Sequence, residues 1–144
     1  MPNLYTEIEI NAPRASVWQV LIDKKNWLRW NTFLYDRDPT LPFKQGQTVQ
    51  LSLKRSREEI ETEFEPRILL LQPNVCMRWV YSAPGFRSEH TFELQDLDRN
   101  RTKYLHQEMI SGVFTSLFVP FLRRDEQQGL RRMAMELKRY VEQQ

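Results

Sequence analysis

The residues best able to do chemistry are two histidines and a glutamate in the second half of the chain. His90 and His106 are the only histidines among its 144 residues. If successive side chains alternate between the two faces of a strand, His90, His106 and Glu108 share one face. An imidazole beside a carboxylate can fix the register of a sheet, anchor a polar ligand, or exchange a proton near neutral pH. These three interpretations stay open here, and no residue is assigned a catalytic role.

The pairing of the two strands decides which of these side chains meet. A turn centred near Arg99 places Phe92 opposite His106 and His90 opposite Glu108. A register shifted by two residues would instead place His90 opposite His106. Either register brings the three polar side chains together on the concave wall of a sheet.

Other chemistries find less support. The two histidines and Glu108 match no established zinc-ligand spacing. Cys76 is expected on the face opposite Met77 and Trp79, no serine has a nucleophile-elbow context, and the four glycines form no phosphate-binding cluster. We therefore predict no catalytic residue, no metal site and no cofactor, and a binding protein rather than an enzyme.

Length and composition narrow the class of protein. The 144 residues predict a single domain spanning residues 1–144. Because 21 basic residues are balanced by 19 acidic ones, we expect no nucleic-acid partner. A single cysteine favours a reducing compartment, and no apolar run approaches the ~20 residues of a membrane span. We expect a cytoplasmic protein without stable membrane insertion, and the oligomeric state stays open.

The first third of the chain predicts a strand and two helices. Residues 4–10 alternate apolar and polar side chains, which indicates a half-buried strand. Pro13 suits the first turn of the helix that follows. A second short helix carries Trp27 and Trp30, and residues 35–45 are expected to form a loop.

The middle of the chain predicts five consecutive antiparallel strands. From Gly46 to Gly112, apolar residues recur with a period of two, interrupted by turn-forming clusters. The first strand is expected within residues 46–54. The second is expected over residues 60–71, with Pro66 bending it.

The last element is a predicted helix over residues 117–142 with one apolar stripe. Glu126 and Gly129 lie near the centre of that stripe. Glycine in a helix costs ~1 kcal/mol relative to alanine, and a buried carboxylate costs more unless it has a partner. Two interpretations follow: Gly129 allows close approach of the helix to the sheet, or the helix roofs a cavity into which Glu126 and Gly129 look. The stripe consists of Phe118, Leu122, Leu130, Met133, Leu137, Tyr140 and Val141.

This order of elements resembles the helix-grip fold of the START and birch-pollen-allergen superfamily (SRPBCC), closest to its polyketide cyclase/dehydrase and lipid-transport branch. The resemblance implies an α+β fold, in which a curved antiparallel sheet wraps around the long C-terminal helix and leaves a cavity between them. It carries over no catalytic motif. The motifs behind it, in order, are residues 10–13 with Val17-Trp18, Trp30-Asn31 with Phe33, Pro73 before residues 77–79, residues 89–92, residues 106–108 with Gly112, and Gly129-Leu130.

We accordingly predict binding or transport of a small hydrophobic or amphipathic ligand in that cavity. The alternatives are a polyketide cyclase/dehydratase-type enzyme using the His/Glu patch, and a protein-interaction module. The apolar run in residues 114–122 either caps the core or forms a lip at the cavity mouth that contacts a membrane or a partner transiently. The predicted ligand-binding residues are Trp79, Tyr81, His90, Phe92, Tyr104, His106, Glu108, Ile110, Leu122, Glu126 and Met133.

Overall fold

The protein has an α+β architecture in a computed structural model. The structure describes residues 3–56, 60–113 and 115–144. For residues 115–122 it describes the backbone but not the side chains. Its elements are β1 (Asn3–Ile10), α1 (Arg14–Ile22), the 3-10 helix η1 (Lys24–Arg29), β2 (Leu34–Asp36), β3 (Leu51–Leu53), β4 (Thr62–Phe64), β5 (Arg67–Gln72), β6 (Cys76–Ala83), β7 (Phe86–Asp98), β8 (Arg101–Ser111) and α2 (Thr115–Glu142).

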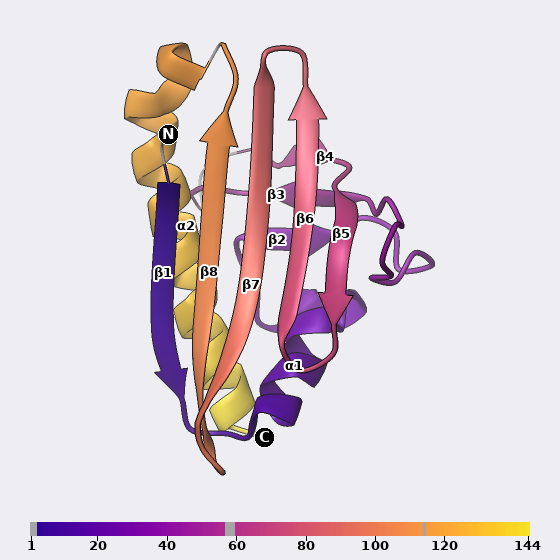
Figure 1. The fold of residues 1–144 in the computed structure, drawn as a ribbon, viewed down its shortest axis with the longest axis vertical. Coiled ribbons are helices and arrows are strands. Elements are labelled where there is room, and N and C mark those ends of the chain that lie inside the picture. Colours follow the sequence, from indigo (N-terminus) through magenta and orange to yellow (C-terminus); the bar gives the residue numbers. More distant parts are fainter. Residues whose placement is uncertain (1–2, 57–59, 114) are drawn as a thin grey trace.

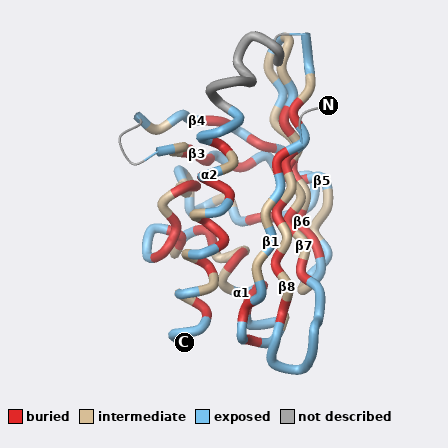
Figure 2. The backbone as a smooth tube through the Cα atoms, turned by 90° about the vertical axis from the view of Figure 1, so that its left-hand side faces the viewer, coloured by how far each residue is buried: buried red, intermediate tan, exposed pale blue. Residues whose placement is uncertain are grey.

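The strands form two antiparallel sheets. The larger has five strands in the order β1-β8-β7-β6-β5, and the smaller has three in the order β2-β3-β4. Figure 1 shows α2 behind β1 and β8, with α1 and the smaller sheet behind the other strands. In Figure 2 all these elements lie on one side of the larger sheet, so the core is sandwiched between two layers. The predicted helix-grip fold class is confirmed.

Three boundaries differ from the sequence-based prediction. The strand expected within residues 46–54 is reduced to β3, which belongs to the smaller sheet. The strand expected over residues 60–71 divides at Pro66 into β4 and β5, because proline has no N–H to donate to a ladder. The predicted loop over residues 35–45 begins inside β2.

The segment before β3 joins the two sheets. Gly46 N donates to Ile68 O at 2.7 Å, and Val49 N donates to Pro66 O at 3.0 Å. Residues 46–49 therefore pair irregularly with the start of β5 before the chain turns away into the smaller sheet.

The hairpin of β7 and β8 has the register expected for a turn near Arg99. Phe92 lies opposite His106, and His90 lies opposite Glu108. The turn is held by Asp98, whose carboxylate accepts hydrogen bonds from Asn100 N at 2.9 Å and from Arg101 Nε at 2.8 Å. The alternative register, with His90 opposite His106, is not the one adopted.

Helix α2 approaches the rest of the molecule closely at Gly129. A methyl group at this position would overlap the ring of Phe33, which is fully buried. The backbone around Phe33 is fixed by Asn31, whose side-chain oxygen accepts hydrogen bonds from Phe33 N and Leu34 N, both at 2.9 Å. Gly129 therefore serves close packing rather than a cavity.

One turn further on, Arg132 ties α2 to the loops beneath it. Its guanidinium donates to Lys54 O at 2.7 Å, to Arg55 O at 3.2 Å and to Thr32 Oγ1 at 2.9 Å. Thr32 Oγ1 in turn donates to the carboxylate of Glu136 at 2.6 Å. These bonds fix the backbone of Arg55 beside the helix.

Among the described residues, no helix combines the length and the apolar character needed to span a membrane.

We predict that Gly129→Ala destabilises the protein although alanine favours helices. Overpacking against the fully buried Phe33 ring costs about 1–3 kcal/mol, against a helix-propensity gain of about 1 kcal/mol. Urea denaturation should show a net loss of up to about 2 kcal/mol. The exposed neighbour Gln128 is the control, and Gln128→Ala should stay within about 0.5 kcal/mol of wild type. Equal or greater stability of Gly129→Ala would show that Phe33 can move aside.

Candidate functional site

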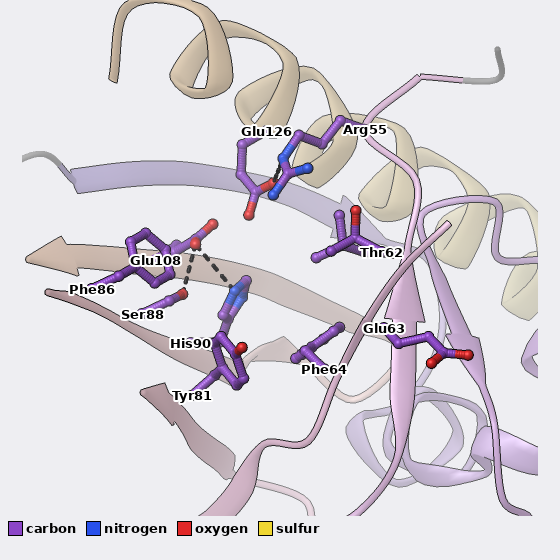
Figure 3. Close-up of a pocket in the computed structure, with 11 residues that line it drawn as sticks. Arg55, Thr62, Glu63, Phe64, Tyr81, Phe86, Ser88, His90, Glu108 and Glu126 are labelled. Atoms are coloured by element: carbon purple, nitrogen blue, oxygen red, sulfur yellow. Dashed lines mark hydrogen bonds and ion pairs between the residues drawn. The ribbon is translucent and has the colours of Figure 1, made fainter. Parts of the chain in front are cut away.

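A cavity of about 70 Å³ lies where the larger sheet, the smaller sheet and α2 meet. Figure 3 shows the carboxyl groups of Glu108 and Glu126 facing each other, with His90 and Ser88 below them and the rings of Phe86, Tyr81 and Phe64 around this polar group. Its lining side chains are Leu53, Arg55, Thr62, Glu63, Phe64, Tyr81, Phe86, Ser88, His90, Glu108 and Glu126.

The predicted ligand-binding residues divide into three groups. Tyr81, His90, Glu108 and Glu126 line the cavity. Leu122 lies among the residues whose side chains are not described, as does the apolar run predicted to form a lip. The others do not line the cavity and are buried in the packed core, so a ligand-binding role for them stays a prediction: Trp79, Phe92, Tyr104, His106, Ile110 and Met133.

His90 and Glu108 form the floor of the cavity. His90 Nε2 lies 3.4 Å from Glu108 Oε2, and Ser88 Oγ donates a hydrogen bond of 2.7 Å to the same oxygen. The other imidazole nitrogen, His90 Nδ1, lies 2.8 Å from His106 Nε2. Because His90 is opposite Glu108 across the hairpin, the β7–β8 register alone brings these groups together.

Glu126 reaches this floor from α2. Figure 3 shows its carboxyl group hanging from the helix toward Glu108, with the side chain of Arg55 beside it. Arg55 Nε lies 2.9 Å from Glu126 Oε1. Only 5% of the surface of Glu126 is exposed, against 2% for Glu108. Both carboxyl groups are therefore almost completely removed from water.

The two carboxyl groups have opposite pKa shifts. Burial raises the pKa of Glu126 well above its ordinary value, and the negative charge of Glu108 raises it further. Burial by itself would also raise the pKa of Glu108, but His90 and the hydrogen bond from Ser88 outweigh it and lower that pKa. The two shifts favour the proton on Glu126 over Glu108, while the guanidinium of Arg55 opposes the rise in the pKa of Glu126.

Each of the two imidazoles packs against an aromatic ring. The ring centroids of Phe92 and His106 are 4.0 Å apart, and those of Trp79 and His90 are 5.4 Å apart. Burial and the nearby His90 lower the pKa of His106, and Tyr104 Oη lies 3.5 Å from its Nδ1. Trp79, Phe92 and Tyr104 thus contact the two imidazoles and fix their positions.

Sequence reasoning missed much of the lining. Ser88 was within reach, because it lies two residues before His90 and therefore on the same strand face. Arg55 follows β3 in a segment read as a turn, and nothing in its neighbourhood signals a partner on α2. Phe64 escaped notice because β4 belongs to a second sheet that periodicity does not reveal.

The protein has a helix-grip fold, and solved structures with the same fold resemble it over nearly its whole length. Among solved structures, a START superfamily protein from Mycobacterium smegmatis is 18% identical, with a TM-score of 0.70 over 98% of this chain and 97% of that one. A protein from Arthrobacter aurescens is 14% identical, with a TM-score of 0.75 over 99% of this chain and 87% of that one.

A third similar structure is larger than this chain. The di-domain ARO/CYC protein BexL, from the BE-7585A biosynthetic pathway, is 16% identical with a TM-score of 0.74. The alignment covers 99% of this chain and 47% of BexL. No protein-family model and no curated protein sequence matches the chain. At these identities the likeness concerns the fold.

We predict that Glu126→Gln becomes increasingly stabilising relative to wild type as pH rises. The folded-state pKa of Glu126 is raised, so its stabilising contribution is complete below the unfolded-state pKa and is lost as pH rises through the folded-state pKa. Glutamine cannot lose that proton. Melting temperatures in EDTA-containing buffer should show the mutant-minus-wild-type difference growing from about pH 5 to about pH 9. Glu63→Gln, on the exposed side of the cavity, is the control, and a constant difference for Glu126→Gln would contradict the assignment.

Proposed function

We propose that the chain binds a small hydrophobic or amphipathic ligand, as a carrier or sensor, in the cavity between the larger sheet and α2. The observation that supports this proposal is a cavity with a buried polar floor and aromatic walls. A mainly apolar pocket with a few orienting polar groups is the usual composition of a small-molecule site.

The polar floor offers a ligand an acceptor. Glu108 Oε1 is buried beside the cavity, where the carboxyl group of Glu126 is the neighbouring side chain that hydrogen-bonds to Glu108. A charged acceptor at the cavity favours a ligand that donates a hydrogen bond to it from a hydroxyl group. A hydrogen bond to a charged group contributes about 1.5–3 kcal/mol, or about 10–100-fold in affinity.

The aromatic walls favour a flat apolar body. The ring centroids of Phe64 and Tyr81 are 5.8 Å apart in an edge-to-face arrangement, and those of Tyr81 and Phe86 are 6.5 Å apart. These rings flank the space above His90 and Glu108 (Figure 3). An aromatic ligand with a hydroxyl group would pack its ring against them and place its oxygen on the floor.

The size of the cavity indicates how such a ligand lies. Its volume of about 70 Å³ is smaller than the ~300 Å³ at the lower end of pockets that enclose drug-sized ligands. The polar head and part of the ring fit inside. The remainder extends toward β4, where the cavity reaches the exposed residues Thr62 and Glu63.

The proposal predicts discrimination between two ligands of similar size. Wild-type protein in EDTA-containing buffer should bind 2-naphthol about 10–100-fold more tightly than 2-methoxynaphthalene, because only the naphthol can donate to Glu108. Glu108→Gln replaces a charged acceptor with a neutral one and should reduce this preference about tenfold. Isothermal titration calorimetry measures both affinities.

Glu63→Gln is the matched control, because it removes a carboxylate from the cavity rim without touching the floor; its preference should equal that of wild type. Equal affinity of wild type for both compounds would exclude Glu108 as the anchor. If neither compound binds, the proposal of an aromatic-walled ligand site is contradicted.

A further inference from the structure

Three potential metal-ligating side chains meet at the polar end of the cavity. His90 comes from β7, Glu108 from β8 and Glu126 from α2, and one ligating atom of each lies within 4.8 Å of the others. All three side chains are buried. We propose that His90, Glu108 and Glu126 form a binding site for a divalent transition metal, with Zn²⁺ as the ion that fits best.

The distance between two of the donor atoms suits zinc, and a ligating atom of Glu126 lies within 4.8 Å of both. Tetrahedral zinc binds nitrogen at ~2.0–2.1 Å and carboxylate oxygen at ~2.0–2.2 Å, so neighbouring ligand atoms lie ~3.4 Å apart. His90 Nε2 and Glu108 Oε2 are separated by 3.4 Å. A charge-assisted hydrogen bond between such groups is normally shorter, at ~2.7–2.9 Å. The pair is therefore spaced as two ligands of one ion.

Each of the three side chains also has an outer partner of the kind that orients metal ligands. His90 Nδ1 lies 2.8 Å from His106 Nε2, which leaves Nε2 for the metal. Ser88 donates to Glu108 at 2.7 Å. Arg55 Nε lies 2.9 Å from Glu126 Oε1, so the other oxygen of Glu126 is the one available to an ion.

The charges of the site agree with a divalent ion. Two carboxylates buried side by side repel each other. A divalent cation between them would neutralise both charges. With a neutral imidazole the complex has no net charge, so the guanidinium of Arg55 faces no excess of positive charge.

The ligand set selects among ions. One imidazole nitrogen and two carboxylate oxygens match the nitrogen and oxygen ligands of zinc, whereas Mg²⁺ and Ca²⁺ require about six or more oxygens. Three protein ligands leave a fourth position open toward the cavity of about 70 Å³, which has room for a water molecule. Among the described residues, no other His/Cys/Asp/Glu group has this arrangement.

Titration of tag-free protein, stripped with EDTA and dialysed, tests the site with ZnCl₂ alone. Calorimetry should show one Zn²⁺ per chain with a submicromolar Kd, and no heat with MgCl₂. Glu126→Gln and Glu108→Gln should each weaken binding at least about 100-fold, more than the loss of an outer partner does. Glu65→Gln, at an exposed position outside the cavity lining, should bind as wild type does. Micromolar or weaker binding by wild type, or equal binding by either floor variant, would overturn the proposal.

Cobalt provides a readout that depends on no variant. Wild-type protein loaded with Co²⁺ should show the intense visible absorption of tetrahedral Co²⁺, and the pale spectrum of the octahedral aqua ion would overturn the site. Because no organic ligand is present, both outcomes are independent of the proposed ligand-binding function.

Discussion

The site depends on one constraint, the antiparallel register of β7 and β8. Side chains on a strand alternate between faces, so a slip of one residue would move the whole inward set to the outer face. The observed register places His90 opposite Glu108 and Phe92 opposite His106. The short turn around Asp98 and Asn100 maintains it. The polar floor, its aromatic support and the cavity above it all follow from this alignment.

Helix α2 completes the floor, and its position is set by packing elsewhere along its length. The contact of Gly129 with Phe33 brings the helix close, and Arg132 ties it to the backbone at Lys54 and Arg55. A buried carboxyl group such as Glu126 disfavours burial of the face that carries it. The apolar residues further along the same face offset that cost, and Arg55 reduces it. Glu126 interrupts an otherwise apolar stripe of α2. It is therefore the residue that places a polar group of the helix in the cavity.

Periodicity was enough to predict which residues face inward but not which of them line open space. His90, Glu108 and Glu126 were predicted to face the cavity and do line it, and the register adopted is one of the two that the sequence left open. Trp79 and Phe92 share the inward face with Tyr81, but they lie further along the strands, against other core rings. Which positions along a strand line open space depends on the elements that pack over that part of the sheet. The smaller sheet is such an element: alternation predicted the strands that contain β3 and β4, but not that they pair with β2 in a second sheet. Arg55 was missed for the same reason.

The central claim is that this cavity holds a ligand with a polar group. Native mass spectrometry of freshly purified protein tests it most directly, because it requires no assumption about the ligand. The account predicts an added mass corresponding to one small molecule bearing a hydroxyl or similar donor group, released when the protein unfolds. Detection of the unliganded chain alone, both as isolated and after incubation with a small-molecule extract of the producing cells, would contradict it.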